Sequence, residues 1–340
     1  MMMKKYAVVG TGSIGSLLGG YLSHGGYDVT MVPTFSREKA DTLQRAGLWM
    51  GSLDPNDDTK FHTDIKAKFI DDLDQERFDV VLLAVKSNDL VQATEKIAPH
   101  LAEDGFVVTF QNGINEEFLI PIVGQDRVVA GSSFAGGHLE DDGHMYSHEG
   151  FFVVGELDGS VTARVKELAE VLDCCKPTEV SDHIRAYQWE KMGRVCLSIP
   201  CACISGLYLG DVFMEPRLQK LFAHLALEVM AVAGADGCPM DTLEGKSRQE
   251  WRDVADGKLT GLENRDDGAW PPGIVDAYTA DVQRGRPLEI VNTNGAVSRL
   301  GRRYGLLTPA NDLIVQCVLD IRNGKAVRGF HLVNNILDQI

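Results

Sequence analysis

The sequence predicts an α/β domain with a mostly parallel, doubly wound sheet, followed by an all-helical domain. Up to about residue 182, short apolar strand-like runs alternate with helical patterns, as in domains built from strand–helix–strand units. After residue 182, strand patterns nearly vanish and helical periodicity dominates. A chain of 340 residues is also longer than one hydrophobic core usually covers. We therefore expect two domains, residues 1–182 and residues 183–340.

The strands expected in the first domain are short runs rich in Val and Phe. They are Tyr6–Val9, Val29–Val32, Val80–Val85, Phe106–Phe110, Arg127–Gly131 and Phe151–Val154. Helical patterns lie between several of them, and a strand that follows a crossover helix returns parallel to its predecessor. The alternation therefore predicts a parallel sheet with helices on both faces.

The second domain is expected to consist of helices with apolar residues at helical spacing. The expected helices are Ile184–Ile199, Arg217–Gly234, Val275–Val282, Glu289–Tyr304 and Asn311–Ile321. The stretch Met240–Pro272 is polar and rich in Asp, Gly and Pro, so we expect one helix around Lys246–Val254 and then a loop.

Composition excludes several classes of partner. The net charge of −16, with no basic stripe, disfavours nucleic acid. No apolar run approaches the length of a membrane span, which predicts no membrane role. The N-terminus passes from Lys4 and Lys5 into a strand without a cleavage site, which indicates a cytoplasmic protein.

Cysteine and histidine spacing predicts neither a disulfide framework nor a metal site. The seven cysteines lack CxxC spacing, and Cys174, Cys175, Cys201 and Cys203 are interpreted as buried thiols. His138, His144 and His148 share one polar stretch with two aspartates, but their spacing fits no standard ligand pattern. The two aspartates are Asp141 and Asp142.

A glycine-rich turn follows the first expected strand at once. Its residues are Gly10, Thr11, Gly12, Ser13, Ile14 and Gly15, and a helical pattern begins within it. In a GxGxxG turn the first glycine permits a tight bend, the second lets a pyrophosphate approach, and the third lets the helix pack closely. The helix N-terminus adds N–H donors for the anion. The sequence therefore predicts a Rossmann-type dinucleotide site.

The end of the second strand favours NADP over NAD. An NAD site usually ends this strand with an acid that binds the ribose 2′-hydroxyl, whereas here it ends Val32-Pro33-Thr34. Asp28 stands at the wrong end of the strand. Arg37 follows its carboxyl end and is the expected ligand of the 2′-phosphate. The alternative is an exposed first-turn residue of the next helix, paired with a neighbouring acid such as Glu38 or Asp41.

Four further segments lie in the order typical of one family. They are Ala84–Ser87, Phe110–Gly113, Trp189–Lys191 and Gly285–Ile290, with Asn294-Gly295 and Pro309–Asn311 after them. Over essentially its whole length the chain resembles the ketopantoate reductases (2-dehydropantoate 2-reductases). The resemblance implies that the second domain is a helical 6-phosphogluconate-dehydrogenase-like domain, and that the protein forms a homodimer through it.

The resemblance also implies roles for individual residues. Lys86 and Asn112 would contact the nicotinamide side of the cofactor, and Gly136 would also bind the cofactor. Lys191 would protonate the keto oxygen of a 2-oxo acid, and Glu289 would hold the lysine and the cofactor or substrate in place. The chemistry is coherent, because a partly desolvated ammonium can neutralise the charge that hydride delivery places on oxygen.

Three positions depart from the family pattern. Val195 and Ile199, four and eight residues after Lys191, replace asparagines that bind substrate, and Ala277 replaces a serine. Residues at this spacing share one helix face, so an apolar wall is expected where polar contacts should be. Polar side chains nearby, each expected to serve packing or the surface, are Arg194, Ser198, Tyr278 and Thr279.

The leading hypothesis is therefore an NADPH-dependent reductase of another 2-oxo acid or ketone, or the reverse dehydrogenase. A second hypothesis is ketopantoate reductase proper, with the substrate pocket rebuilt from other residues. A third, from a different class, is a protein that binds NADP to sense its redox state and has lost catalysis. The presence of Lys191 and Glu289 favours an enzyme, because a sensor needs neither.

Overall fold

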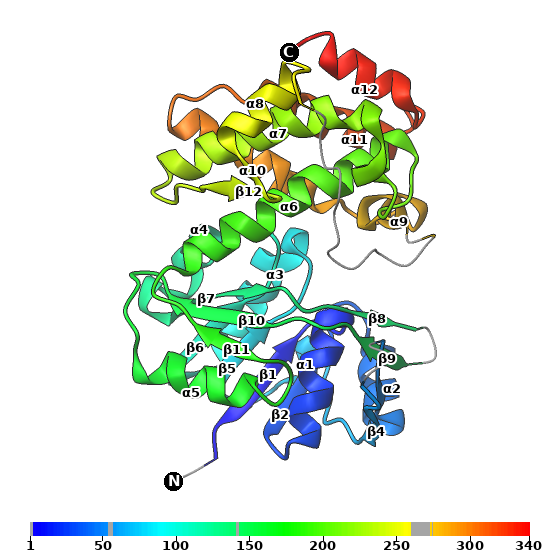
Figure 1. The fold of residues 1–340 in the computed structure, drawn as a ribbon. Helices are drawn as coiled ribbons and strands as arrows, with labels where there is room; N and C mark the ends of the chain where they lie inside the picture. Colours follow the sequence, from blue (N-terminus) through cyan, green and yellow to red (C-terminus); the bar gives the residue numbers. More distant parts are fainter. Residues whose placement is uncertain (1–2, 54–56, 141–142, 260–272, 274) are drawn as a thin grey trace. The chain divides into compact units, whose positions relative to one another are not determined.

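The computed structural model describes residues 3–53, 57–140, 143–259, 273 and 275–340. By its contacts the chain divides into two compact units (Figure 1). The first comprises Met1–Gln111 and Asn115–Tyr187, and the second comprises Asn112–Ile114 and Gln188–Ile340. A short segment that follows a strand of the first unit thus groups with the helical unit.

The first unit contains a seven-stranded sheet in the order β11-β10-β7-β6-β5-β1-β2. The strands are β1 (Lys5–Val9), β2 (Asp28–Val32), β5 (Phe78–Leu83), β6 (Leu101–Thr109), β7 (Val128–Ser133), β10 (Phe152–Glu156) and β11 (Thr178–Val180). Neighbouring strands pair in parallel, except that β10 is antiparallel to β7. The expectation of a mostly parallel sheet is confirmed.

Helices cover both faces of this sheet because its strands are apolar on both sides. In β1, Tyr6 and Val8 pack with α1 (Ser13–His24) and α5 (Ala163–Leu172) on one face. Ala7 and Val9 point the other way and pack in the core with α3 (Leu90–Ile97) and α4 (Glu116–Val123). This is the doubly wound arrangement that continuous apolar strands predict.

A second sheet in this unit was not expected from the sequence. Its four strands lie in the order β4-β3-β9-β8. They are β3 (Leu48–Ser52), β4 (Lys60–Thr63), β8 (Gly137–Leu139) and β9 (His144–Ser147). β3 pairs in parallel with β9, far along the chain, and the rings of Trp49 and His144 stack across this pair. Short strands held by such a distant partner leave little local signal.

The second unit is mostly helical (Figure 1). Its helices are α6 (Ile184–Ser205), α7 (Pro216–Ala235), α8 (Arg248–Ala255), α9 (Ala277–Gln283), α10 (Asn294–Arg303), α11 (Pro309–Arg322) and α12 (Phe330–Leu337). The first turn of α6, up to Tyr187, groups with the first unit. Three details differ from the expectation. The predicted helix from Glu289 begins as a 3-10 turn, η6 (Glu289–Asn292), and α12 was not predicted. A hairpin of β12 (Thr242–Leu243) and β13 (Lys246–Ser247) means that this half is not entirely helical.

The long helix α7 is apolar enough to be a candidate membrane span, which the sequence analysis missed. Contrary to the sequence expectation, this 20-residue helix has the length and mean hydropathy, 1.3, of a membrane-crossing segment. Its side chains are largely buried inside the protein, including Leu221, Phe222, Leu225 and Val229. It contacts α8, α10, α11 and α12. These contacts are those of the central core helix of the unit, and they account for its apolar composition.

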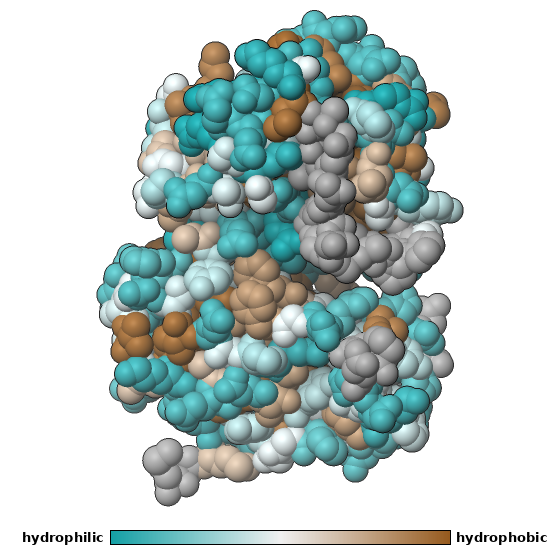
Figure 2. Space-filling view, in the orientation of Figure 1, coloured by the Kyte–Doolittle hydropathy of each residue, from teal (hydrophilic) through white to brown (hydrophobic). Residues whose placement is uncertain are grey.

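Large apolar side chains do reach the surface at separate places. Phe35, Leu307 and Val327 are the most exposed of them. They come from different parts of the chain, and the face drawn in Figure 2 is mostly hydrophilic with small apolar patches. Scattered exposed apolar residues of this kind are ordinary for a folded protein.

Candidate active site

The glycine turn lies between the carboxyl ends of β2 and β5. The N–H of Gly10 donates to the carbonyl of Val32 at 3.0 Å, and the N–H of Ala84 donates to the carbonyl of Val9 at 2.8 Å. Gly10 has a φ of +105°, and a Cβ there would lie 2.7 Å from the backbone of Ala84. Only glycine can make this turn at the point where the strand order reverses, where open α/β sheets bind ligands.

The other two glycines have different reasons for lacking a side chain. A Cβ on Gly15 would lie 2.0 Å from the carbonyl oxygen of Gly10, so this glycine permits the close approach of α1. A Cβ on Gly12 would meet no atom of the described residues within 4 Å. The space beside Gly12 therefore lies open in front of the α1 N-terminus, which carries no acidic residue in its first turn. This arrangement fits a dinucleotide pyrophosphate.

The remaining residues of the turn complete this helix start. Ser13 and Ile14 are the first residues of α1 and are partly buried. The carbonyl of Thr11 accepts a hydrogen bond from the Ser16 hydroxyl at 3.5 Å. Gly12 occupies the N-cap position without a side chain to satisfy the first N–H groups, which leaves these donors to an anion.

Arg37 is the first residue of α2 (Arg37–Ala46) and has a partner that the sequence did not suggest. Its Nε and Nη2 atoms donate to the carboxylate of Asp72 at 3.0 and 2.7 Å. The guanidinium also lies over the ring of Phe69, 5.0 Å from its centroid. Asp72 ends the 3-10 turn η1 (Ile70–Asp72). Arg37 is thus paired with an acid, though not with Glu38 or Asp41.

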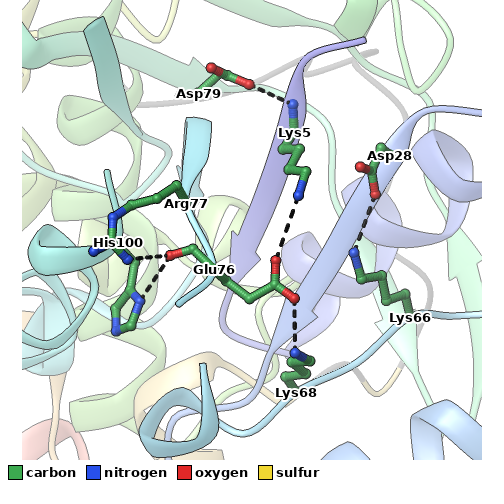
Figure 3. Close-up of polar contacts among 8 residues, drawn as sticks. All are labelled: Lys5, Asp28, Lys66, Lys68, Glu76, Arg77, Asp79 and His100. Atoms are coloured by element: carbon green, nitrogen blue, oxygen red, sulfur yellow. Dashed lines mark hydrogen bonds and ion pairs between the residues drawn. The ribbon is translucent and has the colours of Figure 1, made fainter. Parts of the chain in front are cut away.

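Asp28 does not lie at the ligand edge. It begins β2, and its carboxylate pairs with Lys66 at 3.4 Å (Figure 3). The same view shows Lys5, at the start of β1, beside Glu76, which also binds Lys68 at 2.8 Å. These ion pairs lie at the amino ends of the strands, opposite the glycine turn. Asp28 therefore cannot serve as a ribose-binding acid.

The expected nicotinamide-side residues follow strands at their carboxyl ends. Lys86 is partly buried and precedes the 3-10 turn η2 (Ser87–Asp89). The side-chain amide of Gln111 donates to the carbonyls of Leu83 and Val85 at 2.7 and 2.9 Å, which ties the end of β6 to that of β5. Asn112 is the next residue along the chain, and Gly113 after it has a φ of +97°.

Gly136 follows β7 at the same end of the sheet. Its carbonyl accepts a hydrogen bond from the N–H of His148 at 2.9 Å. Of the described residues, a Cβ at this position would meet the His148 ring alone, at 3.8 Å. The backbone here is therefore nearly open, as a close ligand contact requires.

Lys191 lies in the second turn of α6 and has an altered acidity. Its pKa is lowered to about 8, first because the ammonium is buried and then because the Arg194 guanidinium is near. The carboxylate of Glu244 acts in the opposite direction and raises it. Nε of Arg194 lies 3.0 Å from Oε1 of Glu244, whose side chain is 1% exposed. Sequence reasoning missed Glu244, which comes from the β12–β13 turn.

Glu289, the carboxylate expected beside the lysine, begins η6 and is partly buried. Its charge contributes to raising the pKa of Tyr278, mainly raised by burial. The Tyr278 hydroxyl hydrogen-bonds to the Thr293 hydroxyl at 2.7 Å. The sequence motif around Glu289 therefore leads into a buried polar network of the helical unit.

That network holds α6 at its proline. Pro200 has no N–H, so the carbonyl of Cys196, four residues earlier, loses its usual helical donor. The side-chain amide of Asn294 supplies one at 3.0 Å and also donates to Asn311 at 2.9 Å. Glu228 of α7 accepts from the backbone and side-chain N–H groups of Asn311, at 2.9 and 2.7 Å. Asn294 and Asn311 thus fix the helix that carries Lys191.

The positions that depart from the family pattern are apolar or exposed. Val195 is buried, Ile199 is partly buried, and Ala277 is exposed at the start of α9. The polar residues nearby serve other contacts. The hydroxyl of Ser198 donates to the carbonyl of Arg194 at 2.9 Å, while Thr279 is buried within α9.

The cysteine interpretation needs one correction. Cys175, Cys201 and Cys203 are buried as expected, but Cys174 is exposed. Among the described residues, no three His, Cys, Asp or Glu side chains gather as metal ligands would. Burial is the main cause that lowers the pKa of His148, and the His138 side chain lowers it further. Asp141 and Asp142 lie outside the described residues.

Comparison with known proteins identifies the family. Residues 6–159 match the family model described as ketopantoate reductase PanE/ApbA, and residues 183–322 match the model of its C-terminal domain. The chain belongs to the ketopantoate reductase family. The 2-dehydropantoate 2-reductase of Archaeoglobus fulgidus is 29% identical over 329 residues, which cover 95% of this chain and 100% of the relative.

Further relatives extend the comparison. The Aquifex aeolicus 2-dehydropantoate 2-reductase is 25% identical, with 93% of this chain and 96% of the relative covered. The ternary structure of D-mandelate dehydrogenase with NADH and anilino(oxo)acetate shares the fold, with a TM-score of 0.79, 20% identity and coverage of 95% and 100%. The Ralstonia eutropha ketopantoate reductase structure has a TM-score of 0.75 at 24% identity, covering 94% and 99%. The ketopantoate reductase family comprises oxidoreductases that act on CH–OH groups.

Proposed function

We propose that this protein is an NADPH-dependent reductase of a 2-oxo acid, with Lys191 as the proton donor to the keto oxygen. The observation that carries the proposal is the place of Lys191 on α6, beside the Arg194–Glu244 ion pair and within the stretch that matches the C-terminal family model. Burial and the Arg194 guanidinium lower the pKa of Lys191 to about 8, which supports the same role. An ammonium of this acidity neutralises developing negative charge and releases its proton near neutral pH, as a general acid must. Glu289 would hold the lysine and its ligands in position.

The cofactor half of the proposal depends on the glycine turn. Gly10, Gly12 and Gly15 would accept the pyrophosphate at the α1 N-terminus, and a bound nicotinamide would supply the hydride. Lys86, Asn112 and Gly136 would contact its nicotinamide side. Arg37 would bind the 2′-phosphate and so favour NADP, although it must then share its guanidinium with Asp72. NADH is the alternative cofactor, since the fold is shared by a dehydrogenase solved with NADH.

The side chains expected to face the substrate differ from the polar ones of the family pattern. Val195, Ile199 and Ala277 offer no hydrogen-bonding side chains, so a 2-oxo acid with a bulkier or less polar side chain should bind better than hydroxylated ketopantoate. Ketopantoate reductase proper, which would make pantoate for pantothenate biosynthesis, is the second candidate because curated relatives carry that name. A catalytically inactive NADP sensor is the candidate from another class.

One experiment separates these candidates. Purified protein is mixed with NADPH or NADH and with ketopantoate, aliphatic 2-oxo acids and an aryl 2-oxo acid, and cofactor absorbance is followed. We expect turnover of a less polar acid, with a loss of at least a hundredfold in Lys191→Ala. Ketopantoate as the best substrate would favour the second candidate. Cofactor binding without turnover of any acid would favour the sensor, and full activity in Lys191→Ala would exclude Lys191 as the donor.

We also propose that residues 1–182 form the cofactor domain and residues 183–340 the catalytic domain of a cytoplasmic homodimer. The family models support the division, since they match residues 6–159 and 183–322. A structure of a dimeric ketopantoate reductase from Staphylococcus aureus shares the fold, with a TM-score of 0.69. Sedimentation of the purified protein would test the dimer.

A further inference from the structure

The β12–β13 hairpin makes its turn at an unfavourable residue. Glu244 and Gly245 both have positive φ, +52° and +72°, which is the backbone of a two-residue type I′ turn. Asn or Gly usually occupies the first of these positions, because a longer side chain is disfavoured in the left-handed region. The turn therefore carries a strained glutamate, and such strain persists where the side chain has another use.

The hairpin is fixed against α6 beside Lys191. Gly193, two residues after the lysine, allows the contact, because a Cβ there would lie 2.8 Å from a methyl of Leu243. Leu243 is 1% exposed, and its carbonyl accepts a hydrogen bond from the Trp251 indole of α8 at 3.0 Å. The residue before Glu244 is thus held on α6 by packing and by a buried hydrogen bond.

This packing brings the Glu244 carboxylate to the charged face of α6. Its side chain is 1% exposed, and it lies 3.0 Å from Nε of Arg194. Arg194 comes three residues after Lys191, and residues at this spacing are neighbours on a helix surface. Burying a carboxylate is unfavourable unless cations compensate for its charge. Arg194 is in direct contact with the carboxylate, and Lys191 is near enough for Glu244 to raise its pKa.

We propose that Glu244 is a positioning residue for the proton donor, holding the Lys191 ammonium in place and keeping it charged at neutral pH. The inference rests on the proposed function only in naming Lys191 the donor. Burial alone would drive the lysine towards its neutral form, in which it has no proton to give. Glu244 opposes both this burial and the charge of Arg194.

Other ionisable groups around α6 have separate partners. Glu228 of α7 binds the backbone and side chain of Asn311, and burial raises its pKa. Tyr278 of α9 bonds to Thr293 and lies within electrostatic range of Cys196 and Glu289. Among the described residues, the Arg194 guanidinium lowers the pKa of Lys191 and the Glu244 carboxylate raises it.

Removing the charge of Glu244 and removing that of Arg194 should therefore shift the pKa of Lys191 in opposite directions. Glu244→Gln removes the charge that raises the pKa of Lys191, so this pKa should fall by about one unit. Arg194→Gln removes a charge that lowers it and releases Glu244 towards the lysine, so the pKa should rise. If the ion pair only stabilised the fold, both variants would be less stable, and the pKa of Lys191 would not move in opposite directions.

The pKa of Lys191 can be measured without turnover. In protein made with ¹³Cε-labelled lysine, the Lys191 signal is assigned by its loss in Lys191→Arg and is titrated by NMR in the cofactor-free enzyme. Glu190→Gln is the matched control, because Glu190 is an exposed acid directly beside Lys191 in the sequence. We expect a smaller shift there than in Glu244→Gln. An unchanged Lys191 pKa in Glu244→Gln would overturn the proposal.

Turnover gives the second measurement. The rate of 2-oxo acid reduction should fall as pH rises through the pKa of Lys191, and this midpoint should move down in Glu244→Gln and up in Arg194→Gln. Glu244→Asn keeps the downward shift while relieving the turn, so unfolding effects can be separated from charge effects. Midpoints that move together would contradict the proposal. A shifted NMR pKa in a protein that reduces none of the acids would support the role of Glu244 and contradict the proposed function.

Discussion

The guanidinium of Arg37 donates two hydrogen bonds to the carboxylate of Asp72, a residue 35 positions away in the chain. Both side chains are about half exposed, at 54% and 46%. The pair brings an acid beside the end of β2, where the strand itself ends without one. If Arg37 binds the 2′-phosphate, as proposed, NADPH affinity would depend on how strongly that phosphate competes with Asp72 for the same cation.

Replacing either member of this pair should change NADPH affinity, in opposite directions for the two residues. Arg37→Ala should weaken NADPH binding about tenfold, because a charge-assisted hydrogen bond to a phosphate is lost. Asp72→Asn should strengthen it a few-fold, because a carboxylate beside the phosphate is removed. Fluorescence titration with NADPH measures both effects, and NADH, which lacks the phosphate, is the control. Equal losses for both cofactors in Arg37→Ala would show that Arg37 does not select the phosphate.

The glycine turn offers a comparison between two alanine variants. Gly15→Ala should destabilise the first unit by several kcal/mol, because its Cβ would lie 2.0 Å from the Gly10 carbonyl oxygen. Gly12→Ala should fold normally, because its Cβ would have no neighbour within 4 Å in the part of the chain that the structure describes. It should nevertheless lose cofactor affinity, since the methyl enters the space left for the pyrophosphate. Thermal unfolding and cofactor titration test both claims, and tight cofactor binding by Gly12→Ala would place the pyrophosphate elsewhere.

The contact between Asn294 and the proline-broken turn of α6 predicts a coupled pair of variants. Asn294→Ala leaves the Cys196 carbonyl without this donor and should cost about 1–3 kcal/mol. In a Pro200→Ala background the helix regains an N–H for that carbonyl, so the same change should cost less. A double-mutant cycle by urea unfolding measures the coupling. Fully additive losses would mean that Asn294 acts only through Asn311. The exposed Asn334→Ala is the control.

The features that could be predicted are formed by residues that are close together in the sequence. The glycine turn, its strand and its helix lie within one continuous segment, and their spacing alone predicts the fold around Gly10. The apolar runs of β1, β2 and β5 are equally local. Lys191 was found through a resemblance that spans the chain, because a single lysine on a helix carries no signal of its own.

Features that depend on distant pairing could not be predicted. Strand β3 is held by β9, and neither has the long alternation that identifies a strand by itself. Asp72 reaches Arg37 only after the chain has passed through β3 and β4. Glu244 lies in a turn whose usual sequence is Asn-Gly, so turn chemistry gave no reason to expect a buried carboxylate there. In each case the partner is set by tertiary packing.

The lowered pKa of Lys191 also predicts how stability depends on pH. The folded-state pKa, about 8, lies below the ordinary value of 10.5, so between these pH values the unfolded chain binds more protons than the folded one. This lysine therefore costs stability below pH 8, and the cost disappears as pH rises towards 10.5. Lys191→Met should be more stable than the wild type at pH 7, with the difference shrinking by pH 9.5. Urea unfolding followed by tryptophan fluorescence measures it, with the exposed Lys325→Met as control. A difference for Lys191→Met that is the same at both pH values would mean that the lysine is not held in a desolvated site.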